Sequence, residues 1–179
     1  MRLLVTGGAG YVGSVVATQL LEAEHAVTIV DDLSTGHRDA VPAGATYVAA
    51  DLLDWRSADR VEDAHPELAS GFDAIVHLAA RSLVPESTRD PARYFRHNLE
   101  GALNLVELMR RTRIPRIIFS STAAVYGEPD ETPISESAPT RPTNAYGASK
   151  LAVDELLRFA AAAYGLAAVS LRYFNVAGA

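Results

Sequence analysis

The chain has 179 residues, a formal net charge of -6 and a composition that is 49% hydrophobic and 21% charged. These values fit one globular domain with a hydrophobic core, and an acidic chain without a basic run argues against nucleic acid or an anionic membrane as a partner. The lack of cysteine excludes disulfides and cysteine-ligated metals, and we predict no metal site. The sequence shows no signal-peptide core and no long apolar span, so we expect a cytoplasmic protein.

The first predicted elements are a short strand, a glycine-rich turn and a helix over residues 11–24. Residues 8–13 fit the pattern G-x-G-x-x-G, and Gly7, Gly10 and Gly13 also fit G-x-x-G-x-x-G. Glycine suits such a turn because it adopts unusual backbone angles, lets the backbone approach a pyrophosphate and allows close contact between helix and strand. The helix directs its unpaired N–H groups and the positive end of its dipole toward those phosphates. The order strand, turn, helix therefore predicts dinucleotide binding.

The second predicted strand covers residues 26–30 and ends in Asp31 and Asp32. A carboxylate at this point, about 20 residues past a glycine loop, is placed to accept hydrogen bonds from the adenosine ribose hydroxyls. The same charge repels a 2′-phosphate, so the sequence predicts NAD and not NADP as the cofactor. We take Asp31 as the ribose ligand and leave the role of Asp32 open.

The third predicted strand, residues 46–50, leads into Asp51 and Leu52. Two interpretations of Asp51 stay open at this point, because a carboxylate there could contact the adenine edge or could cap a turn. Asp54 is a candidate cap for a helix over residues 55–64.

The fourth predicted strand covers residues 72–78 and leads into Ala79 and Ala80, whose small side chains would let the chain pass close to a bound cofactor. His77 closes this apolar strand. A structural role is favoured for it over a catalytic one, because a single histidine in an apolar strand carries no partner for catalysis in the sequence pattern.

Apolar residues at helical spacing predict a helix over residues 91–113, which contains Asn98 and is closed by Pro115. A fifth strand over residues 114–119 follows, with a Ser-Ser-Thr run at positions 120–122. This run is expected at the carboxyl end of the strand, the edge where open α/β sheets bind their ligands.

Residues 128–142 carry four of the nine prolines and no clear periodicity, which predicts a long loop. A helix over residues 144–164 and a strand over residues 167–172 complete the pattern. Six strands alternating with helices predict an α/β fold, a Rossmann-type doubly wound parallel sheet with helices on both faces, formed as one NAD-binding domain over residues 1–179.

Tyr146 and Lys150 are four residues apart and therefore share one face of the predicted helix. A phenol with a pKa of about 10 is a poor base at neutral pH, whereas a neighbouring ammonium together with the positive nicotinamide ring lowers that pKa and favours the phenolate. Lys150 is the only lysine beside fifteen arginines. A compact ammonium on a flexible stem suits this task better than a guanidinium. Thr122 supplies a hydroxyl that could orient a substrate hydroxyl or relay a proton.

Taken together, these motifs resemble the extended short-chain dehydrogenase/reductase family, and the similarity runs from Arg2 to Ala179. The quoted motifs are Thr-Gly-Gly-Ala-Gly-Tyr-Val-Gly at 6–13, Asp-Asp-Leu-Ser-Thr-Gly at 31–36, His-Leu-Ala-Ala at 77–80, Phe-Ser-Ser-Thr-Ala-Ala-Val-Tyr-Gly at 119–127, Tyr-x-x-x-Lys at 146–150 and Arg-Tyr-Phe-Asn at 172–175. Within the family, the set is most similar to the epimerases that interconvert UDP-glucose and UDP-galactose.

The resemblance implies that Tyr146 takes the proton of the sugar 4-hydroxyl while the C4 hydride passes to NAD. A 4-keto sugar then turns in the site and receives the hydride on its other face. Thr122 would bond the same hydroxyl, Lys150 would hold the cofactor ribose and tune the tyrosine, and Asn175 would lie near the sugar. The substrate partner is a UDP-sugar, and the family's helices at Asn98 and Tyr146 pair across a homodimer.

The resemblance also implies a set of cofactor contacts that is wider than the glycine loop and Asp31. The implied set is Gly7, Gly10, Tyr11, Val12, Gly13, Asp31, Asp32, Ser34, Thr35, Gly36, Asp51, Leu52, Leu78, Ala79, Ala80, Asn98, Ser120, Tyr146, Lys150, Tyr173 and Phe174. Ser82 departs from the pattern, because some family members carry a lysine there that reaches the cofactor phosphates.

Three alternatives remain. A nucleotide-sugar 4,6-dehydratase places an Asp-Glu pair after the corresponding threonine, whereas Thr122 is followed by Ala123 and Ala124. A uronate epimerase or decarboxylase is harder to distinguish. The third alternative is an NAD-binding module that is inactive alone, because the family's chain continues into a small domain that clamps the nucleotide and these 179 residues do not supply it.

Overall fold

The computed structural model describes residues 1–55, 61–69 and 71–177. In this part of the chain, six parallel strands form one sheet in the order β3-β2-β1-β4-β5-β6. The strands are β1 (Arg2–Thr6), β2 (Ala26–Asp31), β3 (Thr46–Ala49), β4 (Ala74–His77), β5 (Arg116–Thr122) and β6 (Ala167–Tyr173). Strand order reverses between β1 and β4, and this crevice at the carboxyl ends is where doubly wound sheets bind ligands. The predicted Rossmann-type fold is confirmed.

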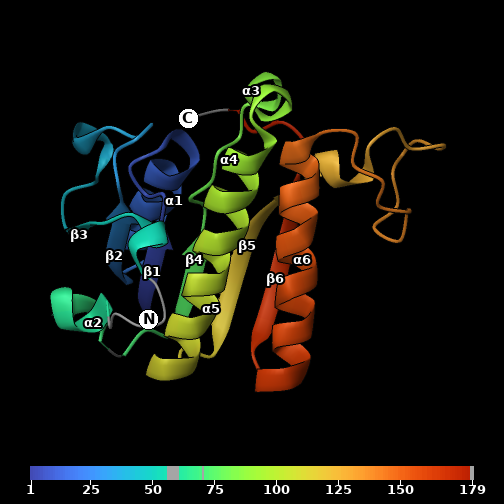
Figure 1. Ribbon diagram of the computed structural model, residues 1–179. Helices are drawn as coiled ribbons and strands as arrows, with labels where there is room; N and C mark the ends of the chain where they lie inside the picture. The colour runs from blue at the N-terminus through green and yellow to red at the C-terminus, as the bar shows by residue number, and fades with distance from the viewer. Residues whose placement is uncertain (56–60, 70, 178–179) are drawn as a thin grey trace.

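Six α-helices connect the strands in the described residues. They are α1 (Tyr11–Glu22), α2 (Val61–Ala64), α3 (Val84–Arg89), α4 (Pro91–Phe95), α5 (Gly101–Thr112) and α6 (Ala145–Tyr164). Short 3₁₀ turns occur at η1 (Arg38–Ala40), η2 (Leu52–Asp54), η3 (Pro66–Leu68) and η5 (Ala123–Tyr126), and η4 (Arg96–Glu100) is a π-helical turn. Figure 1 shows α4, α5 and α6 in front of the sheet, with the carboxyl ends of the strands at the top. None of the described helices is long and apolar enough to cross a membrane.

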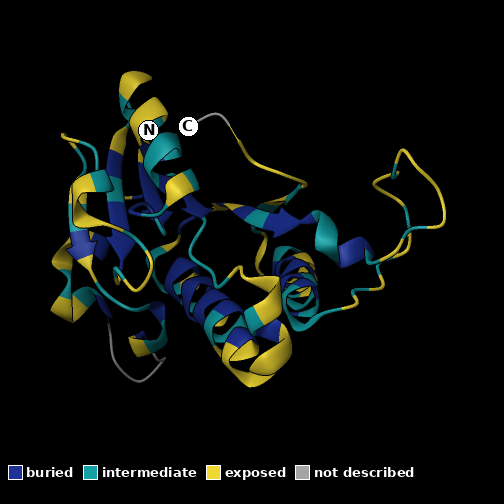
Figure 2. Ribbon diagram, turned by 90° about the horizontal axis from the view of Figure 1, so that it is seen from above, coloured by how far each residue is buried: buried dark blue, intermediate teal, exposed yellow. Residues whose placement is uncertain are grey.

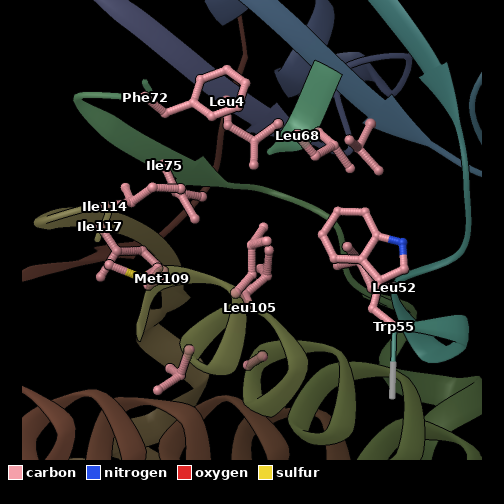
Figure 3. Packing of buried hydrophobic residues seen from close by; sticks show 14 of the residues in the cluster. Leu4, Leu52, Trp55, Leu68, Phe72, Ile75, Leu105, Met109, Ile114 and Ile117 are labelled. Carbon is pink, nitrogen blue, oxygen red and sulfur yellow. The ribbon is translucent and has the colours of Figure 1, made fainter. Parts of the chain in front are cut away.

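The larger hydrophobic core lies between the sheet and the helices α5 and α6. Leu4, Ile75 and Ile117 from three neighbouring strands meet Leu105 and Met109 of α5 (Figure 3). All five side chains are at most 2% exposed. The outward sides of the helices are exposed while their inner sides are buried (Figure 2), as expected for amphipathic helices that cover a sheet.

A second, smaller core packs α1 against the opposite face of the sheet. Ala17 of α1 lies against Val5 of β1, Ile29 of β2 and Val76 of β4. The central strand β1 is therefore covered on both faces, which explains its continuous apolar run. This packing also fixes the start of α1 above the carboxyl end of β1.

The helix predicted over residues 91–113 occurs as three consecutive pieces, α4, η4 and α5. The chain leaves the last piece at Arg113, whose left-handed φ of 60° ends the helix two residues before Pro115. The helix α3 was not predicted, because six residues are too few to show a periodic pattern. Of the helix predicted over residues 55–64, positions 56–60 lie outside the described residues, and the last turn is helical as α2. Asp54 lies within η2, whose cap is Asp51.

The long loop predicted over residues 128–142 is confirmed, since no helix or strand occurs between Gly127 and Asn144. It projects from the body of the molecule beside the start of α6 (Figure 1) and is largely exposed (Figure 2).

The larger core predicts the effect of a cavity in α5. Leu105→Ala removes a fully buried side chain from the centre of the cluster, so we expect a loss of about 2–5 kcal/mol in the free energy of unfolding. Glu22→Ala at the exposed last residue of α1 serves as the control and should change stability by less than about 0.5 kcal/mol. Urea unfolding of both variants measures this, and equal losses would contradict the core assignment.

Candidate active site

A cavity of about 410 Å³ opens at the carboxyl ends of the strands, between the glycine loop and the start of α6. Most of the predicted site residues line it. The predicted residues in its wall are Gly7, Gly10, Tyr11, Val12, Gly13, Asp31, Asp32, Ser34, Thr35, Asp51, Leu52, Leu78, Ala79, Ala80, Ser120, Thr122, Tyr146, Lys150, Tyr173 and Phe174. Segments from both ends of the sequence therefore meet around one space.

The glycine loop is packed too closely for side chains at two positions. Gly7 has a φ of +75°, and a Cβ atom there would lie 2.5 Å from the backbone nitrogen of Ala79. A Cβ atom on Gly13 would lie 2.0 Å from the carbonyl oxygen of Gly7. These contacts hold α1 and the exit of β4 against the loop. Gly10 is the N-cap of the helix α1 and provides no side-chain hydrogen bond, which leaves the first turn of the helix to the cavity.

The carboxylate of Asp31 ties the end of β2 to the glycine loop. Its Oδ2 accepts a hydrogen bond from the backbone N–H of Ala9 at 3.0 Å, and its Oδ1 accepts one from Leu33 at 2.8 Å. Each carboxylate oxygen has a further lone pair that can accept a bond from a ligand. Asp31 therefore orders the loop and also presents its charge to the cavity.

Asp51 caps the turn η2, because its Oδ1 accepts a hydrogen bond from the backbone N–H of Leu53 at 2.9 Å. The capping alternative is thus confirmed. The same residue lines the cavity, so the adenine contact stays a prediction.

The start of α6 is held close to the end of β5. Asn144 caps the helix by accepting a hydrogen bond from the N–H of Gly147 at 2.8 Å. A Cβ atom on Gly147 would lie 2.6 Å from the carbonyl oxygen of Ala124, so only glycine permits this approach. Tyr146 and Thr122 consequently line the same cavity from two different elements.

Lys150 is buried, with 2% of its surface exposed. Its Nζ donates a hydrogen bond to the carbonyl oxygen of Ser120 at 2.9 Å and lies 4.7 Å from the centre of the Phe119 ring. Burial lowers the pKa of Lys150 to about 7, and the carboxylate of Asp154 acts in the opposite direction. The Lys150 side chain therefore changes between its ammonium and its neutral amine form close to neutral pH.

Burial raises the pKa of the Tyr146 phenol, and interaction with the Thr122 side chain lowers it by a smaller amount. The net direction in this structure is upward, and the lowering expected from Lys150 together with the positive nicotinamide ring stays a prediction. The physical reason for the upward direction is that desolvation disfavours the phenolate more strongly than the neighbouring polar groups favour it.

His77 lies in the core and not in the wall of the cavity. Its Nδ1 is 2.7 Å from the hydroxyl of Thr6, its ring stacks on Phe119 with centroids 5.5 Å apart, and it is 2% exposed. Burial and, to a smaller extent, the charge of Lys150 lower its pKa to about 3. These contacts agree with the structural role favoured from the sequence.

Three predicted contacts are not in the cavity wall. Asn98 is buried behind it, where its side chain accepts a hydrogen bond from the N–H of Arg81 at 2.8 Å and donates to Ser149 at 2.9 Å. Gly36 packs on the glycine loop, since a Cβ atom there would lie 2.9 Å from the backbone of Ala9. Asn175 is exposed after β6. Asn98 and Gly36 thus support the site from outside.

The structure adds lining residues that were not among the predicted contacts: Val30, Ala50, Arg81, Ser82, His97, Ser121 and Val176. Arg81 is notable, because its Nε is buried and makes no hydrogen bond among the described residues. An unpaired buried guanidinium nitrogen in a cavity wall is a donor available to an anionic ligand. Its position next to Ser82, where the sequence lacks an expected lysine, was the signal that could have identified it.

Comparison with known proteins identifies the family to which the chain belongs. Residues 3–179 match the family model described as the NAD dependent epimerase/dehydratase family. The chain is 56% identical over 179 residues to UDP-glucose 4-epimerase of Corynebacterium glutamicum, and the match covers 100% of this chain and 52% of that protein.

The solved structures that resemble this chain include UDP-glucose 4-epimerases. A crystal structure of UDP-glucose 4-epimerase has a TM-score of 0.93 at 42% identity, with 100% of this chain and 53% of that one covered. The Brucella ovis UDP-glucose 4-epimerase, solved in complex with NAD, has a TM-score of 0.90 at 40% identity, with 99% and 53% covered. The chain thus spans about half the length of the relatives that it matches.

The glycine loop predicts different outcomes at two of its positions. In Gly13→Ala the new methyl group would overlap the Gly7 carbonyl, so we expect a loss of about 1–3 kcal/mol in the free energy of unfolding. Gly10→Ala is the control, because a Cβ atom there meets only the Gly7 oxygen at 3.4 Å, and it should cost less than about 1 kcal/mol. Urea unfolding compares them, and equal stability of the two variants would refute the close packing.

Proposed function

Because the chain belongs to the NAD dependent epimerase/dehydratase family, we propose that it binds NAD and interconverts UDP-glucose and UDP-galactose at sugar C4. Residues 1–179 form the NAD-binding Rossmann domain in this proposal. The observation that carries it is the shared cavity, in which the glycine loop and Asp31 lie together with Tyr146, Lys150 and Thr122.

The residues present fit NAD. The cofactor's pyrophosphate needs a bare backbone and positive partial charge, which Gly10, the start of α1 and the unpaired Nε of Arg81 provide. Its adenosine ribose needs an acceptor, which Asp31 provides at the end of β2. When bound, NAD supplies a reversible hydride acceptor for the sugar C4 and a positive charge near the phenol.

Tyr146 is the residue that exchanges a proton with the sugar 4-hydroxyl in this proposal. Its raised pKa means that the phenol holds its proton until positive charge gathers nearby. Lys150 provides such charge from one helical turn further along α6, and its pKa of about 7 lets its charge change near the working pH. The side chain of Thr122 interacts with the Tyr146 phenol, so its hydroxyl can orient the same oxygen.

Lys150 is kept in place by the backbone of β5. The Ser120 carbonyl fixes one of its three N–H groups, which leaves the others for the phenol and for a ribose hydroxyl. Phe174, which is 65% exposed, and Asn175 follow β6 at the edge of the cavity. They are proposed as contacts to the nicotinamide and the sugar, respectively.

A second candidate function is NAD binding without turnover. It is favoured by one observation, since the chain spans about half the length of the relatives that it matches. The dehydratase alternative is less well supported, because the short turn η5 after Thr122 carries Ala123 and Ala124 and no acid.

We also propose a homodimer formed through the outer faces of the helices α4, α5 and α6. Large apolar side chains are exposed on these helices at Phe95, Leu103 and Phe159, with 38%, 43% and 61% of their surface accessible. Exposed apolar residues gathered on one side are typical of interaction surfaces. The cytoplasmic location expected from the sequence stays a prediction.

Cofactor choice is the first test. We expect the chain to bind NAD at least about tenfold more tightly than NADP, a difference of about 1.4 kcal/mol, because Asp31 repels a 2′-phosphate. Asp31→Asn should reduce this preference, whereas Asp39→Asn, the same charge change at an exposed position, should keep it. Isothermal titration calorimetry with both cofactors measures the ratio. Equal affinities in the unaltered chain would exclude the assigned role of Asp31.

The second test separates binding from chemistry. In the intact enzyme, Tyr146→Phe should leave NAD affinity within about threefold and lower the conversion of UDP-galactose to UDP-glucose by about 10²–10⁴-fold, because the proton acceptor is lost. Tyr164→Phe at the far end of α6 is the control and should keep the activity.

For the 179-residue chain alone, we expect NAD binding to be detected more readily than turnover. Binding with no conversion supports the second candidate function, and robust conversion supports the first. Unchanged activity of the Tyr146→Phe enzyme would rule out the proton-transfer role.

A further inference from the structure

Asp154 lies at the centre of a buried polar cluster behind the candidate active site. It is 9% exposed and follows Lys150 by one helical turn on α6, so both residues share one face of the helix. The helix packs on β5 and β6 (Figure 1). Tyr146, Lys150 and Asp154 therefore form a row at spacings of four residues along one side of α6.

The contacts of Asp154 involve one of its two carboxylate oxygens and leave the other without a hydrogen bond from the described residues. Its Oδ2 accepts a hydrogen bond from the Ser121 hydroxyl at 3.0 Å and lies 3.5 Å from the Nε of Arg172. Its Oδ1 is buried and accepts no hydrogen bond from the described residues. A buried oxygen without a partner is costly, so hydrogen bonding alone does not explain a charged residue at this position.

The charges around Lys150 supply that explanation. Arg172 reaches the cluster from β6 and also donates to the Tyr126 hydroxyl at 2.8 Å, and His77 approaches Lys150 from β4. Among the described residues, Lys150 contacts the Phe119 ring and the Ser120 carbonyl, and Asp154 is the carboxylate that acts on its charge. Without Asp154, the buried Lys150 would lose the carboxylate that offsets its burial.

We propose that Asp154 is a positioning residue of the candidate active site, whose carboxylate keeps the buried Lys150 side chain in its ammonium form beside Tyr146. Its role in catalysis rests on the proposed function, whereas its effect on the charge of Lys150 is independent of it. The direction of the pKa change supports this role, because burial lowers the pKa of Lys150 and Asp154 raises it.

The sequence makes this charge directly measurable. Lys150 is the only lysine of the chain, so isotopic labelling of lysine side chains gives a single εCH₂ signal in an NMR spectrum. In the unaltered chain, we expect this signal to titrate with a midpoint of about 7. As the pH rises through that value, the ammonium is lost.

Asp154→Asn tests the proposal, because asparagine can still accept the Ser121 hydrogen bond but carries no charge. We expect the Lys150 midpoint to fall by about one pH unit or more and Asp154→Glu to restore it at least in part. Glu155→Gln removes the same charge from the next residue, where Glu155 is exposed and pairs with Arg158. This control should leave the midpoint within about 0.3 pH units. An unchanged midpoint in a folded Asp154→Asn chain would overturn the proposal.

A second variant covers the case in which Asp154→Asn does not fold. Uncompensated burial of the Lys150 ammonium predicts that Lys150→Met restores folding when it is combined with Asp154→Asn, as measured by circular dichroism and urea unfolding. If the double variant stays unfolded, Asp154 acts through the contacts with Ser121 and Arg172 and the proposal fails. All of these measurements are made without substrate, so a failed epimerase assay does not affect their outcome.

Discussion

The contact between Gly13 and the carbonyl oxygen of Gly7 constrains the rest of the molecule. Since no side chain fits between them, α1 can lie directly against the end of β1, and its first turn opens on the cavity. Asp31 reinforces the arrangement by binding the backbone of Ala9, which joins the end of β2 to the same loop. The small residue Ala79 completes it from β4. The crevice at the strand reversal is therefore set by backbone contacts and not by flexible side chains.

The wall of the cavity formed by α6 and the end of β5 depends on how the cost of burying the Lys150 charge is offset. Lys150 is buried beside the Phe119 ring and the Ser120 carbonyl, and burial disfavours an ammonium. Its contact with Ser120 and the nearby carboxylate of Asp154 offset part of this cost. The close approach of α6 to the turn η5 at Gly147 brings the start of this helix next to the end of β5. Local packing thus decides the protonation of a residue that the reaction would use.

The sheet and most of its helices were predictable, because buried parallel strands and amphipathic helices leave strong patterns such as residues 26–30 and 144–164. Motif spacing also identified most of the cavity wall. The short helix α3 and the break at η4 were not predictable, because they depend on tertiary packing rather than on periodicity. The sequence likewise could not give the net direction of the Tyr146 pKa, which depends on how deeply the phenol is buried. The unpaired Nε of Arg81 is visible only in the structure, although the position of this residue next to Ser82 was a signal in the sequence.

The single lysine among fifteen arginines has a physical explanation. Several of the arginines that the structure describes pair with carboxylates, as Arg111 does with Glu62. A guanidinium remains charged at any physiological pH and needs several acceptors in one plane. The space around position 150 offers one backbone carbonyl, one aromatic ring and a carboxylate one turn away. Only a compact cation whose pKa can fall toward neutrality fits there, and lysine is the side chain with that property.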